Sequence, residues 1–282
     1  MIRKKFTSKV LLFLVLILII SLGLGMKWGY NHLNRKLNGV TKGVFLEGMN
    51  MEGYLPQEVR QIVELLALEQ ERKSQNAALN KKTGEIIPSK PGIAVDQERT
   101  MGLVIHSPGD MHLNLITYVV EPVLSTDDLA KITKVIGTYT THFSGSPGRY
   151  QNIKIAMQTI NNTLVMPNEL FSFNLVTGPK TARKGYQLAP VIIGEGHTLG
   201  LGGGVCQVSS TLYNAARKSN MTIIERHAHS KPIRYVPPGH DAAIADGGKD
   251  LKFRNPYNYP IIIKASVQGG RIQVWILGKE GS

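Results

Sequence analysis

The chain has a single cysteine, Cys206, which directly follows the glycine-rich stretch Gly202, Gly203, Gly204 and Val205. A lone cysteine cannot form an internal disulfide, so a chemical role is the first interpretation. A glycine-rich loop lets a substrate approach the backbone closely, and the helical spacing that follows places the thiol at a helix start. The free N–H groups and partial positive charge of a helix start favour a thiolate over a thiol. We therefore interpret Cys206 as a nucleophile, with a small buried apolar side chain as the alternative.

Two histidines, His227 and His229, follow the cysteine at the end of a β-rich segment, residues 222–225. In an extended strand both side chains lie on the same side, together with Glu225. A thiol facing a histidine is the usual arrangement of cysteine nucleophiles, because the imidazole accepts the thiol proton and returns it to a leaving amine. Either histidine could be the base while the other positions the substrate or the base, and we take His229 as the first candidate with His227 as the alternative. A structural role for each histidine is the alternative.

Five residues that flank the cysteine or the histidines are candidates for binding the substrate: Gly203, Gly204, Gln207, Ser209 and Arg226. The backbone N–H groups of the glycine loop suit an oxyanion site that stabilises a tetrahedral intermediate. The loop does not have the pattern of a phosphate-binding P-loop, because no Lys-Ser or Lys-Thr pair follows its last glycine.

A metal site is the competing chemistry. Cys206, His227 and His229 would supply three ligands, and His142 or His197 a fourth. Metal sites usually show short, recurring ligand spacings, and the glycine loop has no second cysteine or histidine beside Cys206. We therefore predict neither a metal nor another cofactor.

The N-terminus has the pattern of a signal-anchor. Arg3, Lys4, Lys5 and Lys9 precede residues 10–26, a run of seventeen residues without a charge. That length is at the short end for a membrane-spanning helix, and a basic flank marks the cytoplasmic side. We expect one span in the cytoplasmic membrane with the C-terminal part of the chain extracellular. A cleaved signal peptide is the alternative.

The net charge of +13 is spread unevenly. Residues 1–42 hold eight basic and no acidic residues, residues 43–126 hold seven basic and eleven acidic, and residues 127–282 hold eighteen basic and nine acidic. A basic extracellular domain suits an acidic polymer such as the bacterial cell wall. Nucleic acid is not expected as a partner, because the chain carries an export signal and no basic stripe with interleaved aromatic residues.

The charge pattern and the turns divide the chain into an anchor and linker at residues 1–42, a small module at residues 43–126 and a larger domain at residues 127–282. The small module has the order β-α-ββ-α-β. Pro56 opens its first helix, Lys82, Thr83 and Gly84 form the turn of its strand pair, and Asp96 caps its second helix.

The larger domain mixes helices and strands. Helical spacing appears at residues 152–160, and β-rich segments lie at residues 189–194 and 221–224 and in the tail from residue 250. The predicted fold class is therefore α+β, a membrane-anchored chain of two domains.

Several motifs together resemble the VanW family, which is named from a protein encoded in some glycopeptide-resistance clusters. They are GGGVCQVSSTLYNAA at residues 202–216, ERHAHS at 225–230, YVPPGHD at 235–241 and DLKFRN at 250–255. The resemblance covers about residues 139–278. Residues 43–126 are similar, more weakly, to the peptidoglycan-binding module that often precedes VanW domains.

The resemblance implies a cell-envelope protein. Some VanW-domain proteins are linked to peptidoglycan cross-linking of the L,D-transpeptidase type through a cysteine, which by position is Cys206 here. Family members commonly have Ser-Asn-Arg before an Asn-Ile pair. This chain instead has Gly148, Arg149, Tyr150 and Gln151 before that pair, and Arg149 takes the place of the family's arginine.

Three functions remain open from the sequence. Cys206 would transfer an acyl group between peptidoglycan stem peptides, or water would resolve the acyl-enzyme in a cell-wall peptidase. In the third, a non-catalytic peptidoglycan-binding protein, the cysteine and its loop are structural. The basic surface suits carboxylate-rich stem peptides in all three.

Overall fold

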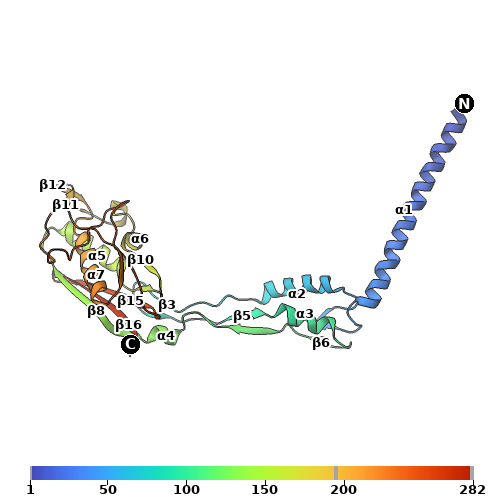
Figure 1. Cartoon of the computed structure of the whole chain (residues 1–282), viewed down its shortest axis with the longest axis horizontal. Coiled ribbons are helices and arrows are strands. Elements are labelled where there is room, and N and C mark those ends of the chain that lie inside the picture. Colours follow the sequence, from blue (N-terminus) through green and yellow to red (C-terminus); the bar gives the residue numbers. More distant parts are fainter. Residues whose placement is uncertain (1, 194–195, 280–282) are drawn as a thin grey trace. The chain divides into compact units, whose positions relative to one another are not determined.

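The computed structural model of the chain describes residues 2–193 and 196–279, and its fold is mixed α+β (Figure 1). Its contacts divide the chain into two compact units. Unit 1 comprises Met1–Gln75 and Pro91–Glu121, and unit 2 comprises Asn76–Lys90 and Pro122–Ser282.

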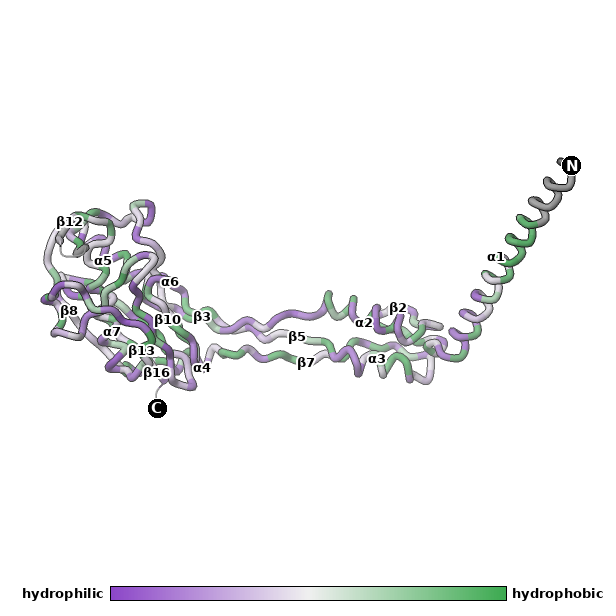
Figure 2. The backbone as a smooth tube through the Cα atoms, turned by 45° about the horizontal axis from the view of Figure 1, so that its top comes forward, coloured by the Kyte–Doolittle hydropathy of each residue, from purple (hydrophilic) through white to green (hydrophobic). Residues whose placement is uncertain are grey.

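Unit 1 begins with a long helix, α1 (Ile2–Asn38). Within the described residues, Leu12–Asn38 is the one helical stretch long and apolar enough to cross a membrane, which fits the predicted single-span anchor. Figure 2 shows the hydrophobic run along this helix. The polar linker predicted after the apolar run is helical as far as Asn38, because no proline interrupts it. Arg35 extends from its last turn to Glu58 and fixes that end.

Two helices form the centre of unit 1, α2 (Pro56–Gln70) and α3 (Gln97–Ile105). Pro56 opens α2, and Asp96 caps α3 by accepting a hydrogen bond from the Arg99 N–H, so both predicted helix starts are confirmed. Short strands complete the unit: β1 (Phe45–Leu46), β2 (Met49–Asn50), β5 (Gly92–Val95), β6 (His112–Leu113) and β7 (Thr117–Val120). β1 pairs with β2 and β6, and β5 pairs with β7.

A hairpin, β3 (Ala78–Leu79) and β4 (Ile86–Ile87), turns at the predicted residues 82–84. Its contacts place it in unit 2, although the sequence analysis assigned it to the small module of residues 43–126. Lys81 contributes to this placement. Its ammonium donates to the carbonyl of Thr159, in the last turn of α5 (Pro147–Ile160), and to that of Asn161, just after the helix.

The framework of unit 2 is an antiparallel sheet in the order β8-β16-β15-β9, whose strands are β8 (Ile132–His142), β16 (Arg271–Lys279), β15 (Ile261–Gln268) and β9 (Thr163–Val165). Helix α7 (Val205–Lys218) packs on β8 and β16, and α5 packs on β15 (Figure 1). Gly137 lets α7 approach closely, because a Cβ there would lie 2.6 Å from the Ala215 carbonyl oxygen. Helix α7 and strand β8 are therefore packed closely at this point.

The remaining elements of unit 2 surround the start of α7. They are α4 (Thr126–Ala130), α6 (Phe173–Thr177), the 3₁₀ turn Ala182–Lys184, the antiparallel hairpin β11 (Leu188–Ile193) and β12 (Gly196–Leu201), and a three-stranded sheet of β10 (Leu170–Ser172), β14 (Lys252–Arg254) and β13 (Thr222–Glu225). Residues 226–251, between β13 and β14, contain no helix or strand. An irregular segment of this length inside a compact unit is usually functional.

Candidate active site

The loop at the start of α7 contains glycines at positions where a side chain would be strained or would clash. Gly204 has φ +104°, a backbone conformation that side chains disfavour, and a Cβ on Gly203 would lie 2.6 Å from the Pro190 carbonyl oxygen. Cys206 is the second residue of α7, and its thiol donates to the Ile244 carbonyl at 3.6 Å. The thiol therefore lies at a helix N-terminus, as the sequence predicts.

A buried amide holds the glycine loop in place. Asn152, on α5, donates to the carbonyls of Gly203 and Gln187 and accepts from the Gln187 N–H. Its side chain is fully buried. The loop before Cys206 is therefore fixed to both α5 and the start of β11.

The small hydroxyl and amide residues of α7 hold the long irregular segment against the helix. Ser209 donates to the Ala242 carbonyl at 2.6 Å, and Ser210 accepts from the Ala242 N–H at 2.9 Å. One turn further on, Asn214 donates to the His240 carbonyl. These bonds bring residues 228–246 over the N-terminal end of α7.

His229 is the histidine that this segment brings to the cysteine. Its Nδ1 donates to Asp241 Oδ2 at 2.7 Å, and its backbone N–H donates to the same oxygen at 2.7 Å. Nε2 is thereby left as the acceptor nitrogen, and the Tyr235 hydroxyl lies 3.4 Å from it. This nitrogen is the one that a general base needs free.

The charge state of the pair follows from its surroundings. Burial alone would lower the pKa of His229, but its hydrogen bonds and charge interactions with Cys206 and Asp241 outweigh burial and raise that pKa. Burial would raise the pKa of Asp241, yet the bonds from His229 and the charge of Arg226 lower it. The surroundings of His229 therefore stabilise the protonated ring that forms when Nε2 accepts a proton, and those of Asp241 stabilise the ionised carboxylate beside it.

His227 lies elsewhere. Its Nε2 pairs with Glu225 Oε1 at 2.9 Å, and Glu225 also binds Lys252. His227 contacts Glu225 as expected, whereas His229 pairs with Asp241. Strand β13 ends at Glu225, so neither histidine lies within it. The alternation of a strand therefore does not apply beyond that residue.

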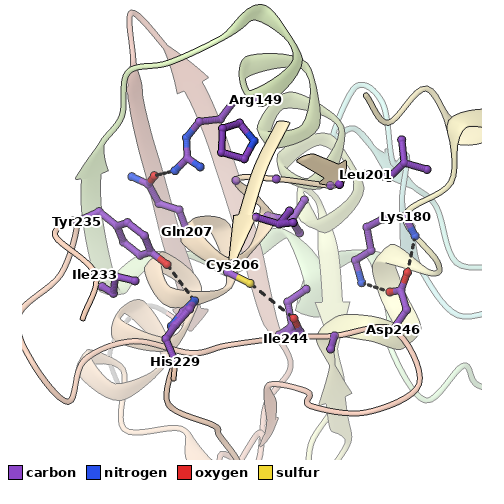
Figure 3. A pocket seen from close by; sticks show the side chains of 18 residues that line it. Arg149, Lys180, Leu201, Cys206, Gln207, His229, Ile233, Tyr235, Ile244 and Asp246 are labelled. Carbon is purple, nitrogen blue, oxygen red and sulfur yellow. Dashed lines mark hydrogen bonds and ion pairs between the residues drawn. The ribbon is translucent and has the colours of Figure 1, made fainter. Parts of the chain in front are cut away.

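Figure 3 shows the cavity that Cys206 and His229 line. Its volume is about 420 Å³. Of the predicted residues, Cys206, His229, Gly203, Gly204 and Gln207 line it. Lining residues that we did not predict include Arg149, Lys180, Tyr235 and Asp246.

Two predicted substrate-binding residues support the site from outside the cavity lining. Ser209 is fully buried and bonds to the carbonyls of Cys206 and Ala242. Arg226 donates to Asp241 Oδ1 at 2.5 Å and lies over the Tyr213 ring. Both residues therefore fix the positions of catalytic candidates.

Asp241 is the functional candidate that sequence reasoning missed. It falls in the motif YVPPGHD, so a search for an acidic partner of the histidine within that motif would have found it. The metal alternative gains no support, since no group of three potential ligands occurs among the side chains that the structure describes. The His197 side chain lies outside those described.

The fold and site define an α+β protein with a cysteine at a helix N-terminus and a histidine–aspartate pair beside it. A family model described as VanW like protein matches residues 148–277. Uncharacterized protein YoaR of Bacillus subtilis (strain 168) is 37% identical over 214 residues, which cover 74% of this chain and 70% of that protein. The chain belongs to the VanW family.

A second relative is Vancomycin B-type resistance protein VanW of Enterococcus faecalis (strain ATCC 700802 / V583). It is 33% identical over 109 residues, 37% of this chain and 40% of that protein. No solved structure matches the chain.

Proposed function

We propose that this chain is a membrane-anchored, cysteine-dependent acyl transferase of the L,D-transpeptidase type, acting on peptidoglycan stem peptides. One observation carries the proposal: His229 interacts with both Cys206 and Asp241, its Nδ1 is held by Asp241, and Cys206 and His229 line the same cavity. Nucleophile, base and orienting acid are the three parts of a nucleophilic triad.

In the proposed first step, Cys206 Sγ attacks the carbonyl carbon of a peptide bond in the donor stem. His229 Nε2 takes the thiol proton and gives it to the departing amine, so a thioester forms and the C–N bond breaks. Backbone N–H groups at the start of α7 are suited to stabilise the oxyanion. The fixed loop of Gly203 and Gly204 keeps those groups in position.

In the second step an amine of another stem peptide attacks the thioester. His229 accepts a proton from that amine, the new amide forms as the C–S bond breaks, and His229 gives the proton to the departing Cys206 sulfur, which restores the thiol and the neutral imidazole for the next cycle. Water in place of the amine would give a shortened stem, the product of a peptidase. The two reactions share the first step, so they differ only in the acceptor.

The cell envelope is the proposed location. The relative from Enterococcus faecalis is named a vancomycin resistance protein, and vancomycin acts on the cell wall. The apolar α1 and the basic residues before it favour a membrane anchor with the remainder outside. We propose the small module of residues 43–126 as a peptidoglycan-binding segment and the domain of residues 127–282 as the catalytic one.

The test is incubation of the full-length chain, in detergent, with muropeptides that carry tetrapeptide stems, followed by mass analysis. A new cross-link that requires both Cys206 and His229 is the expected product. Cys206→Ala and His229→Ala should each remove nearly all product, and the double variant should lose no more than either alone, because the two residues act as a unit.

His227→Ala is the matched control. It removes an imidazole two residues from His229 that is paired with Glu225 and lies outside the cavity lining, so the product should persist. A product that survives in Cys206→Ala overturns the proposal. A shortened stem in place of a cross-link assigns the chain as a peptidase. If no product depends on Cys206, the non-catalytic peptidoglycan-binding role is the function that remains.

A further inference from the structure

Arg149 is the cavity residue that the proposed chemistry leaves unused. It lies in the first turn of α5, and Ser146 caps that helix. Its Nη2 donates to Gln207 Oε1 at 2.7 Å (Figure 3). Gln207 is buried and is itself fixed by bonds to Thr141 and to the His142 carbonyl. The guanidinium is therefore held in one place by a rigid neighbour.

The position of Arg149 is close to the nucleophile. A Cβ on Gly204 would lie 3.1 Å from the Arg149 Cγ, and Gly204 is two residues before Cys206. Arg149 and Cys206 line the same cavity, and a charge on Cys206 raises the pKa of Arg149. A group bound by Arg149 therefore lies near any carbonyl that Cys206 attacks.

The charge balance of the cavity shows which group fits. Lys180 is already neutralised, since its ammonium lies 2.7 Å from Asp246 Oδ1 and 2.9 Å from Asn174 Oδ1. Among the described residues, the side-chain hydrogen-bond partner of Arg149 is the neutral amide of Gln207. Arg149 thus contributes a positive charge that no described carboxylate balances.

Partial burial makes that charge costly unless an anion joins it. Burial lowers the pKa of Arg149, while its interactions with Tyr235 and Cys206 act in the opposite direction. A guanidinium stays protonated in such a site and presents several N–H donors in a planar fork, which matches a carboxylate. The cavity, at about 420 Å³, holds a small ligand or a short end of a larger one.

We propose that Arg149 binds the free α-carboxylate at the C-terminal end of the donor peptide, so that Cys206 attacks the last peptide bond of the stem. The residue that leaves is then the one whose carboxylate Arg149 holds. This inference rests on the proposed function and specifies its donor: a peptide with a free C-terminus. A stem that continues beyond this residue, or ends in a carboxamide, is a poor donor.

The experiment compares two synthetic tetrapeptide stems that differ only in a C-terminal carboxylate or carboxamide. With the full-length chain, release of the last residue is followed by mass analysis. The carboxylate peptide should have a kcat/KM roughly 10- to 100-fold higher, the range of a charge-assisted contact. Arg149→Gln should remove the difference in kcat/KM between the carboxylate and carboxamide peptides, and so abolish the preference.

Two control variants frame the result. Arg149→Lys keeps the charge without the planar fork, so part of the preference should return. Arg183→Gln removes an exposed arginine outside the cavity lining and should leave both peptides unaffected. Equal rates for both peptides in the unaltered chain would overturn the carboxylate inference and leave the proposed function intact.

Binding by Cys206→Ala separates the two failures, because it needs no turnover. Dissociation constants of both peptides are measured for this variant and for Cys206→Ala combined with Arg149→Gln. If Cys206→Ala binds the carboxylate peptide at least 10-fold more tightly than the carboxamide peptide, and the added Arg149→Gln removes that preference, the inference is supported. This holds even if the unaltered chain turns over neither peptide, a result that rejects only the proposed function. Equal dissociation constants reject the inference. A third peptide keeps the C-terminal carboxylate but has the carboxylate within the stem amidated. It should bind as tightly as the unmodified carboxylate peptide, and weaker binding would assign Arg149 to the carboxylate within the stem instead.

Discussion

Asp241 accepts two hydrogen bonds from His229, one from the backbone N–H and one from Nδ1. Arg226 completes the surroundings of Asp241 with a charge-assisted bond to Oδ1. The carboxylate therefore fixes the ring orientation of His229 and stabilises its positive charge. His227, which lies two residues away, has Glu225 as its partner and faces no such network with Cys206.

Asp241→Asn should lower the pKa of His229. Burial, the largest influence on that pKa, lowers it, and the variant removes one of the two groups that oppose burial. Activity should fall by about 10²- to 10⁴-fold, as when the acid of a nucleophilic triad is replaced. NMR titration of ¹³C-labelled histidine measures the pKa, with Lys154→Ala, on an exposed face of α5, as control. An unchanged His229 pKa would contradict the role given to Asp241.

The stability of unit 2 should depend on pH through the same pair. The folded pKa of His229 is raised, so its contribution is full below the unfolded value of about 6.5 and is lost as pH rises through the folded pKa. The folded pKa of Asp241 is lowered, so its contribution is present above about pH 4 and is lost as pH falls through that folded value. The pair therefore stabilises most between about pH 4 and 6.5.

His229→Gln should accordingly reduce the free energy of unfolding by roughly 1–3 kcal/mol near pH 5.5 and by less at pH 9. Urea unfolding followed by the fluorescence of Trp275, on β16 in unit 2, measures both values. The opposite order of the two losses, or an equal loss at both pH values, would show that the histidine is not stabilised as a cation.

At the scale of elements, the site depends on the contact between α5 and the loop that precedes α7. Asn152 makes three hydrogen bonds across this contact and is fully buried. Asn152→Ala should leave buried backbone groups without partners and cost about 2–4 kcal/mol of unfolding free energy. Because Gly203 is released, the rate of Cys206 alkylation by iodoacetamide should also change.

Lys154→Ala, two residues along α5 and exposed, is the control and should change neither quantity. If Asn152→Ala unfolds at the same urea concentration as the unaltered chain, the amide does not support the loop. An unchanged alkylation rate in a destabilised variant would instead separate the stability of the contact from the position of the thiol.

Local patterns predict the helices of both units better than the long loop of the site. The small residues of α7, the proline that opens α2 and the Asp96 cap of α3 are visible in the sequence, because caps and spacing act over a few residues. The choice between His227 and His229 is not visible, because it depends on where β13 ends. Asp241 reaches the site through an irregular segment held by Ser209, Ser210 and Asn214, and such long-range contacts leave no periodic pattern.

At the scale of the whole molecule, the sequence motifs of residues 139–278 are enough to identify the family, since they combine several short patterns. The hairpin of β3 and β4 shows what the sequence does not predict. Lys82, Thr83 and Gly84 predict its turn, but contacts with the rest of unit 2, such as that of Lys81 with the end of α5, are not predicted. A pattern within a few residues predicts the turn and carries no information on what the turn packs against.

The orientation of the chain in the membrane gives the last prediction. Four basic residues lie in the nine residues before the apolar run of residues 10–26, and two lie in the nine residues after it. Because basic residues are retained on the cytoplasmic side, the C-terminus should be outside. Alkaline phosphatase fused to the C-terminus should be active in cells, and a fused green fluorescent protein should be dark. Replacing Arg3, Lys4, Lys5 and Lys9 together by glutamine should reduce the phosphatase signal, since the charge difference is then reversed, whereas replacing Lys81 and Lys82 should not. A bright fluorescent fusion with an inactive phosphatase would place the catalytic candidates in the cytoplasm and exclude assembled cell wall as their substrate.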